Sequence, residues 1–322
     1  DHSSHKSVID SLKILNKNLD HPVGILLDTQ GPEIRTGDIA NDLHLKAGDV
    51  VSIVVRGTDN VEESSIQINY EDLIKDTNIG DTITVDNGLI NLQVLEKQDR
   101  LMKVKVIDGG LLKSKRHVNL PGVRVNLPAI TEKDKRDIKF GIQNKVDFIA
   151  LSFVREASDI KSLQTLLGED KRGTKIIAKL EDQEAIKNME EIIKVSDGVM
   201  VARGDLGVEI PFEVLPRIQR RIIRTCAELG KRSIVATHML ESMINNPIPT
   251  RAEVTDVANA VYEEADAIML SGETTVGKFP VKCVETLDKI ARSTESSRGL
   301  RFTDQLIVNE SKQEIAKAAV SL

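Results

Sequence analysis

The sequence predicts an α/β fold, a TIM (β/α)8 barrel that is incomplete at its N-terminus and carries an inserted all-β lid domain. Short continuous apolar runs are typical of parallel strands buried on both faces. Amphipathic stretches of helix length separate the later runs, and one segment of alternating pattern interrupts them. The runs are Val23–Leu27, Phe148–Leu151, Lys175–Ala178, Gly198–Ala202, Ser233–Ala236 and Ala267–Leu270. Because a closed barrel needs eight strands, we expect the missing pair to precede residue 1.

The first 20 residues predict a helix, because Val8, Leu12, Leu15 and Leu19 fall at helical spacing. From Glu33 to Arg124 the pattern changes to alternation, which predicts a small antiparallel β domain with one wet face. Its expected strands are Val50–Val55, Ser65–Tyr70, Thr82–Asp86, Ile90–Leu95 and Leu101–Ile107, and turns are expected at Gly109-Gly110 and Pro121-Gly122.

The barrel pattern resumes at Thr131, which has an acidic partner, Asp134, at the spacing of a helix cap. Alternating strands and helices continue to Leu287–Ala291, followed by a polar linker from Thr294 and a last helix, Ser311–Leu322. The predicted domains are therefore a first barrel segment (1–32), the lid (33–124), a second barrel segment (125–299), and a linker with the start of a C-terminal α/β domain (300–322).

Composition excludes several classes of partner. The chain has 322 residues and a net charge of −6 with both signs dispersed, which argues against a nucleic-acid surface. No apolar run approaches a membrane span, and no secretory signal is apparent. The two cysteines, Cys226 and Cys283, predict buried inert thiols and a reduced, cytoplasmic setting.

Polar residues at the strand ends form the candidate site, because parallel strands end on one face. Lys179 ends a buried run, Glu181 follows on the same side, and Asp205 holds the corresponding place after the next run. Two carboxylates with room for water suit Mg²⁺, and a lysine beside a metal suits a transferring phosphoryl group. The alternative is that Glu181, like Asp182, merely favours a helix N-terminus.

Three further features have both functional and structural interpretations. Gly204 and Gly207 predict a turn whose amides could bind a carboxylate or phosphate. Thr237 could contact a substrate or simply cap a strand, and His238 is expected to pack locally. The segment from Gly272 resembles a phosphate-binding loop, but Phe279 stands where Ser or Thr should bind Mg²⁺, so we reject that function.

Together these motifs resemble pyruvate kinase. The stretches that carry the resemblance cover nearly the whole chain and are Asp28-Thr29-Gln30-Gly31-Pro32-Glu33-Ile34-Arg35, Asn119-Leu120-Pro121-Gly122, Ser152-Phe153-Val154-Arg155, Lys179-Leu180-Glu181-Asp182, Arg203-Gly204-Asp205-Leu206-Gly207, Thr237-His238-Met239-Leu240-Glu241, Pro249-Thr250-Arg251-Ala252-Glu253 and Ser271-Gly272-Glu273-Thr274. The resemblance implies a barrel with a lid after its third strand, a regulatory C-terminal domain, an allosteric homotetramer, and transfer of the phosphoryl group of phosphoenolpyruvate to ADP, giving pyruvate and ATP in glycolysis.

The resemblance also implies roles for individual residues. Lys179 stabilises the phosphoryl group, and Glu181 and Asp205 bind Mg²⁺ or Mn²⁺. The substrate contacts are Gly204, Asp205, Ser152 and Lys179, with Thr237 beside the enolate carbon. Asp28 and Thr29 bind K⁺, and Glu33 is the form associated with K⁺ dependence. Arg35 and Lys115 face the nucleotide phosphates.

The chain departs from the family pattern at Gln30, His238 and the Leu180 and Asp182 that flank Glu181. Two other functions stay open at this point. One is a different Mg²⁺-dependent barrel enzyme of lyase type acting on phosphoenolpyruvate or pyruvate, against which the lid and Arg35 argue. The other is a catalytically silent regulatory module, against which the intact Lys179, Glu181 and Asp205 argue.

Overall fold

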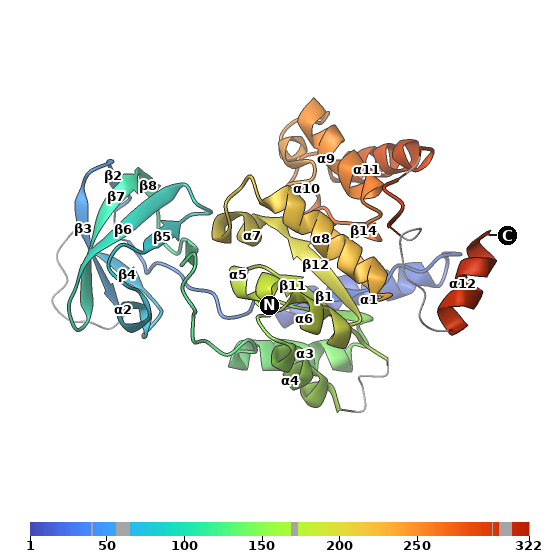
Figure 1. Cartoon of the computed structure of the whole chain (residues 1–322), viewed down its shortest axis with the longest axis horizontal. Helices are drawn as coiled ribbons and strands as arrows, with labels where there is room; N and C mark the ends of the chain where they lie inside the picture. Colours follow the sequence, from blue (N-terminus) through green and yellow to red (C-terminus); the bar gives the residue numbers. More distant parts are fainter. Residues whose placement is uncertain (40, 56–64, 169–172, 298, 303–310, 322) are drawn as a thin grey trace. The chain divides into compact units, whose positions relative to one another are not determined.

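The computed structural model describes residues 1–39, 41–55, 65–168, 173–297, 299–302 and 311–321. The chain forms two compact units, Asp1–Ile218 and Gln219–Leu322. The first unit contains a parallel sheet and the β domain, and the second contains a parallel strand pair with helices (Figure 1).

The parallel sheet of the first unit is built from strands that are far apart in sequence. Its members, in spatial order, are β1 (Leu26–Asp28), β10 (Phe148–Leu151), β11 (Lys175–Leu180) and β12 (Gly198–Ala202). The register pairs Asp28 with Ala150 and Lys179 with Met200, so the carboxyl ends of all four strands lie at one edge. β10, β11 and β12 agree with three of the predicted barrel strands, whereas β1 begins at Leu26 and not at Val23 as predicted.

Two further details of this sheet differ from the sequence analysis. β11 extends to Leu180, so that Lys179 lies inside the strand. β1 is not buried on both faces, since Leu26 is 37% exposed. Among the described residues β1 pairs with β10 alone, which makes it an edge strand. Its Leu27 packs on α3, where a side chain on Gly141 would lie 2.7 Å from Leu27 Cδ1.

Several helices of the first unit begin at local capping signals. Thr131 and Asp134 form the expected capping box of α3, and Asp1 caps α1. The helices are α1 (His2–Asn16), α3 (Glu132–Gln143), α4 (Ala157–Leu167), α5 (Gln183–Lys187), α6 (Met189–Val195), α7 (Arg203–Glu209) and α8 (Leu215–Glu228), the last of which continues into the second unit.

The β domain has its own apolar core, which includes Ile53, Leu92 and Val104. Its six-stranded sheet has the order β4-β3-β7-β6-β5-β9, and β2 pairs with β8 beside it. The elements are β2 (Leu43–Leu45), β3 (Val50–Val55), β4 (Ile66–Ile68), α2 (Leu73–Asp76), β5 (Thr82–Val85), β6 (Ile90–Lys97), β7 (Leu101–Asp108), β8 (Gly110–Leu112) and β9 (Val118–Asn119).

The five expected strands are present in this domain, with three corrections. β3 and β4 pair in parallel, so the sheet is not wholly antiparallel. β3 is buried along most of its length instead of alternating. A strand, β8, begins at Gly110 where a turn was expected, because the chain passes so close to β2 that a side chain on Gly109 would lie 2.2 Å from the Leu45 carbonyl oxygen.

The second unit pairs β13 (Arg232–Ala236) in parallel with β14 (Ala267–Ile268). Both cysteines are buried and free, as expected. α11 extends through Thr294, where a linker was predicted, and some of that linker lies outside the described residues. The remaining elements are the 3-10 helix η2 (Glu241–Ile244), α9 (Arg251–Tyr262), α10 (Gly272–Thr275), α11 (Pro280–Glu295) and α12 (Ser311–Ser321).

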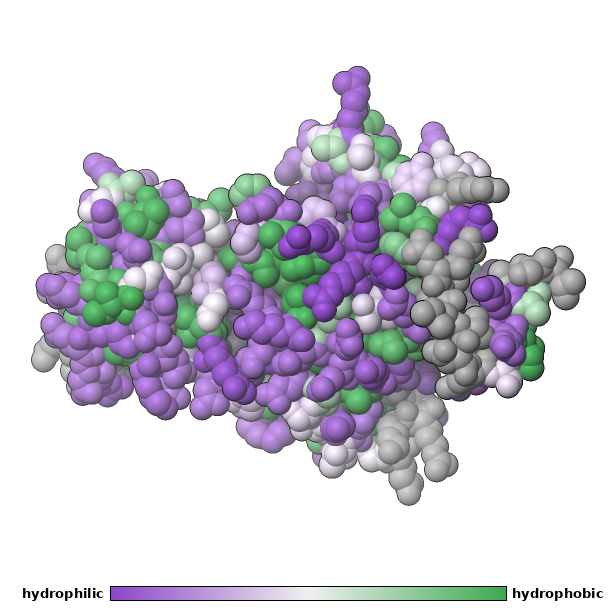
Figure 2. Space-filling model, in the orientation of Figure 1, coloured by the Kyte–Doolittle hydropathy of each residue, from purple (hydrophilic) through white to green (hydrophobic). Residues whose placement is uncertain are grey.

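The face shown in Figure 2 is mostly hydrophilic, with apolar residues in scattered groups. Among the described residues, no helix combines the length and the apolar character that crossing a bilayer requires.

Candidate active site

Most of the predicted site residues line one cavity in the first unit, with a volume of about 410 Å³. The strand ends of the parallel sheet supply one side of its wall, and the β domain supplies the other. The predicted residues around it are Asp28, Thr29, Ser152, Lys179 and Glu181 from the ends of the strands, Asp205 from α7, and Arg35 and Lys115 from the β domain.

Lys179 is held by oxygens from three strand ends. Its ammonium donates to Ser152 Oγ at 2.8 Å and lies 3.1 Å from Asp28 Oδ1 and 3.0 Å from Glu181 Oε1. Only 13% of the side chain is exposed. Burial alone would lower the pKa of Lys179, but the charges of Glu181 and Asp28 outweigh it and raise the pKa. The residue therefore carries a firmly positioned positive charge.

Glu181 is the buried partner of this lysine, with 1% of its side chain exposed. Burial raises the pKa of Glu181 to about 7, and the nearby charge of Asp205 acts in the same direction. The Phe153 N–H donates to Glu181 Oε2 at 2.6 Å, and Phe153 adopts a left-handed φ of 52° to present it. Asp182, by contrast, caps α5 through the Ala185 N–H at 2.7 Å. The helix-start interpretation thus fits Asp182 and not Glu181.

Asp205 lies in the first turn of α7 beside Gly204. Gly204 and Gly207 therefore lie in a helix, and the predicted turn is wrong. Glycine can adopt helical as well as turn conformations, and α7 follows β12 directly. The Asp205 side chain is 32% exposed, and its Oδ1 lies 3.5 Å from His117 Nδ1. Burial lowers the pKa of His117, although the charge of Asp205 opposes this.

Glu181 and Asp205 fit a divalent cation. Both carboxylates line the same cavity, and the charge of Asp205 disfavours ionisation of Glu181. The described residues contain no group of three or more His, Cys, Asp or Glu side chains suited to one metal ion. A divalent ion here would take two carboxylates from the chain and other ligands from water or substrate, as Mg²⁺ commonly does.

Arg35 reaches the cavity from the β domain and is oriented by Glu33. Its Nε donates to Glu33 Oε2 at 2.7 Å and its Nη2 to Glu33 Oε1 at 3.0 Å, while Nη1 donates to the Lys115 carbonyl at 2.9 Å. Burial would raise the pKa of Glu33, but hydrogen bonds from Arg35 and Gln30 keep it lowered. Lys115 is 70% exposed and pairs with Asp38 at 3.2 Å.

The Asp28 carboxylate and the Thr29 hydroxyl and carbonyl are oxygen atoms that could act as metal ligands. The carbonyl of Thr29 accepts from Ser152 Oγ at 2.7 Å, and its hydroxyl accepts from the Ser152 N–H at 3.0 Å. Asp28 is 48% exposed and faces Lys179. This donor set suits a hard cation, for which carboxylate and carbonyl oxygens are the preferred ligands.

Sequence reasoning overlooked several residues of the cavity. Arg116 and His117 precede the Asn119 motif, and Asp86 and Asn87 occupy a turn with φ of 55° and 56°. Arg116 Nη1 lies 3.3 Å from Asp86 Oδ1, and its buried Nε has no hydrogen-bond partner among the described residues. An Asp-Asn-Gly turn and two consecutive basic residues were the available signals, but neither shows which way its side chains face.

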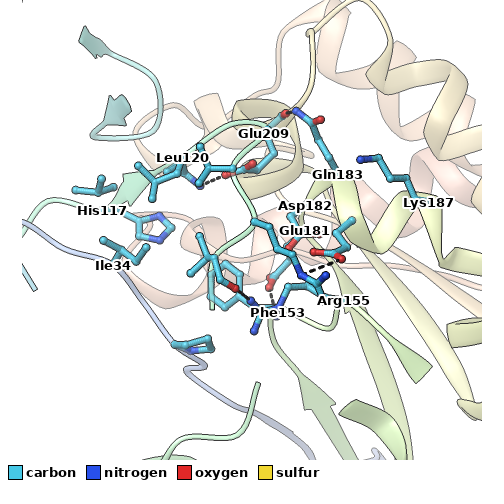
Figure 3. Close-up of a pocket in the computed structure, with 18 residues that line it drawn as sticks. Ile34, His117, Leu120, Phe153, Arg155, Glu181, Asp182, Gln183, Lys187 and Glu209 are labelled. Carbon is cyan, nitrogen blue, oxygen red and sulfur yellow. Dashed lines mark hydrogen bonds and ion pairs between the residues drawn. The ribbon is translucent and has the colours of Figure 1, made fainter. Parts of the chain in front are cut away.

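A smaller cavity of about 210 Å³ lies beside the first and shares His117, Phe153 and Glu181 with it (Figure 3). Glu209, at the end of α7, accepts from Asn119 Nδ2 at 3.1 Å. Burial raises the pKa of Glu209 to about 7, and Asp182 and Asp205 add to the effect. A neutral carboxyl is thus accessible to this chain near physiological pH.

Thr237 belongs to the second unit, just after β13. Its hydroxyl donates to the Ala236 carbonyl at 2.7 Å. Thr237 and His238 have φ of 68° and 55°, in the left-handed region that a β-branched residue rarely adopts. The place of Thr237 in a substrate site stays a prediction.

The chain matches a family model described as the barrel domain of pyruvate kinase over residues 1–284. It is 46% identical to a pyruvate kinase of Staphylococcus epidermidis over 100% of the chain and 57% of that protein. It is 48% identical to one of Staphylococcus aureus over 92% of the chain and 51% of the relative. It is also 46% identical to a plastidial pyruvate kinase 3 of Arabidopsis thaliana, over 94% of the chain and 53% of that relative.

The chain thus spans little more than half the length of these relatives. Its parallel strands, inserted β domain and strand-end residues agree with the match to the barrel model. The chain belongs to the pyruvate kinase family.

Proposed function

We propose that the protein containing this chain transfers the phosphoryl group of phosphoenolpyruvate to ADP, giving pyruvate and ATP. The observation that carries the proposal is the ammonium of Lys179, buried among Asp28, Ser152 and Glu181 in a cavity that Arg35 also lines. Membership of the family supports the same reaction.

The chemical problem is the repulsion between two polyanions. In the transfer, the bond between phosphorus and the enol oxygen breaks, and a bond from phosphorus to the terminal oxygen of ADP forms. Lys179 would stabilise the charge on the phosphoryl oxygens in flight, and Arg35, with Lys115 beside it, would bind the nucleotide phosphates. The enolate that remains takes a proton at carbon, with Thr237 beside that carbon.

The substrate carboxylate would be bound by the first turn of α7, at the amides of Gly204 and Asp205, with Ser152 nearby. Glu181 and Asp205 would hold Mg²⁺ or Mn²⁺, and Asp28 and Thr29 would hold K⁺. The cations supply positive charge that offsets the repulsion between the two substrates. We also propose that the full-length protein is a homotetramer, which light scattering would test.

The test is pyruvate release by the full-length protein, measured with and without ADP, Mg²⁺ and K⁺. We expect release that requires ADP and the divalent ion, and stimulation by K⁺. Formation of pyruvate without ADP would point instead to a lyase. Binding of phosphoenolpyruvate that depends on Mg²⁺, with no pyruvate formed, would overturn the proposal in favour of a silent module.

A further inference from the structure

Glu273 is a buried carboxylate that joins the ends of two neighbouring strands. Its Oε1 accepts from the Leu240 N–H at 3.0 Å, and its Oε2 accepts from the Ser271 N–H at 2.8 Å. Leu240 lies in the segment after β13, and Ser271 lies in the segment after β14. The side chain is 0% exposed, so both bonds are shielded from water.

The segment that Glu273 holds is the one with the unusual backbone. Thr237 and His238 are consecutive left-handed residues, and such a conformation persists only where the surroundings impose it. Met239 and Leu240, which follow directly, are fully buried. The bond to the Leu240 N–H therefore anchors the strained segment immediately beyond its strained residues.

The chain around Glu273 leaves little freedom for compensation. A side chain on Gly277 would lie 2.3 Å from the Glu273 carbonyl oxygen, and one on Gly272 would lie 3.0 Å from Ile244 Cδ1. The short helix α10 is therefore tightly closed at its end by Gly277 and packs on Ile244 of η2. Replacing one carboxylate oxygen with an amide NH₂ would set a donor against a backbone donor.

We propose that Glu273 is a positioning residue for Thr237, fixing the backbone that aims its hydroxyl. This inference rests on the proposed function, in which Thr237 lies beside the carbon that is protonated. Glu273 touches no substrate in this scheme. It acts on the segment that carries Thr237 through the Leu240 amide.

Glu253 provides a matched control in the same unit. Its carboxylate also accepts from two backbone amides, Ser242 N–H at 2.6 Å and Thr250 N–H at 2.7 Å. Those bonds join η2, which begins directly after Leu240, to the start of α9. Glu253→Gln thus perturbs a carboxylate that accepts from backbone amides at Ser242 and Thr250, and from the hydroxyls of the same two residues, but not from the Leu240 amide.

The first measurement is amide hydrogen exchange by mass spectrometry on the full-length protein. Glu273→Gln should speed exchange at Leu240 by at least about tenfold, since a charge-assisted hydrogen bond is lost. Glu253→Gln should leave that amide unchanged. If the Leu240 amide exchanged at the wild-type rate in Glu273→Gln, the proposal that Glu273 holds this segment would be overturned. If Glu273→Gln does not fold, Glu273→Asp, which keeps the charge but is one methylene shorter, is measured in the same way.

The second measurement is exchange of the pyruvate methyl protons for deuterium in D₂O with ATP and Mg²⁺, followed by NMR. Glu273→Gln should slow it about 10- to 100-fold, because misplacement of a reacting group by about 1 Å has effects of that size. The KM for phosphoenolpyruvate should change less than about threefold. If Glu273→Gln and Glu253→Gln lost the same fraction of the methyl-exchange rate, Glu273 would have only a general structural role. A wild-type protein that neither exchanges these protons nor forms pyruvate would contradict the proposed function, while amide exchange would still decide whether Glu273 holds the segment.

Discussion

The charged side chains around the larger cavity form two groups that differ in how they are held. At the end of β11, Lys179 and the following Glu181 are 13% and 1% exposed, and the lysine contacts oxygens from three strand ends. From the β domain, Arg35 and Lys115 are 41% and 70% exposed, and each pairs with one acid. The first group is buried among tertiary contacts, whereas the second is largely exposed to water and salt.

The two groups therefore differ in how strongly their charges interact with their partners. A buried ion pair interacts strongly and loses much when one partner is removed. An exposed pair is screened by water and salt and contributes little to stability. We therefore expect substitutions in the buried group to have large effects on turnover or stability, and substitutions in the exposed group to have smaller effects, mainly on nucleotide binding.

The largest expected effect is that of Lys179→Met. Removing one preorganised charge from a phosphoryl-transfer site should lower kcat about 10²- to 10³-fold. The fold should survive, because burial already raises the pKa of Glu181 to about 7, and without the ammonium that carboxyl can take up a proton. Pyruvate formation and a thermal melt would measure both. Lys175, at the other end of β11, is 57% exposed, and Lys175→Met is the control that should keep its activity.

A second prediction concerns the buried carboxyl of Glu209. Burial raises the pKa of Glu209 to about 7 in the folded chain, from an ordinary value near 4.5. The stabilisation from its proton is therefore complete below pH 4.5 and is lost as the pH rises to 7. Between pH 4.5 and pH 7, the unfolding free energy of Glu209→Gln should therefore rise by about 3 kcal/mol relative to that of the wild type.

Urea unfolding at a series of pH values would measure this gain, with the exposed Glu213→Gln as the control that removes a carboxyl nearby. A constant difference between Glu209→Gln and wild type across the series would show that burial of Glu209 does not couple folding to protonation.

Arg35→Ala should have an intermediate effect. Loss of its guanidinium should raise the KM for ADP about tenfold, the scale of one charge-assisted contact of about 1.4 kcal/mol. The KM for phosphoenolpyruvate should change less. Arg100, exposed in the β6–β7 turn, supplies the matched arginine control. An unaltered KM for ADP would remove Arg35 from the nucleotide site.

Lys115→Ala should have the smallest effect, less than about threefold on the KM for ADP at physiological salt, because its ammonium is exposed and pairs with Asp38. The effect should grow when salt is lowered. A loss as large as that of Arg35→Ala would show that Lys115 moves into the cavity when nucleotide binds, and would erase the distinction between the two exposed cations.

Much of the fold could be predicted because its signals are local. The bounds of β10 and β12 follow from continuous apolar runs, and the start of α3 follows from its capping box. The helical state of Gly204 and the strand at Gly110 could not be predicted, because glycine signals a turn by conformational freedom that neighbouring structure can override.

The sequence by itself determined which residues stand at the ends of successive strands, since an apolar run and the polar residue after it are adjacent in the chain. Tertiary structure alone decided that Asp28, 151 residues from Lys179 in the chain, shares the ammonium of that lysine with Glu181. The physical reason is that burial and pairing of charge depend on groups brought together by folding. Neither the strand period nor a capping pattern contains that information.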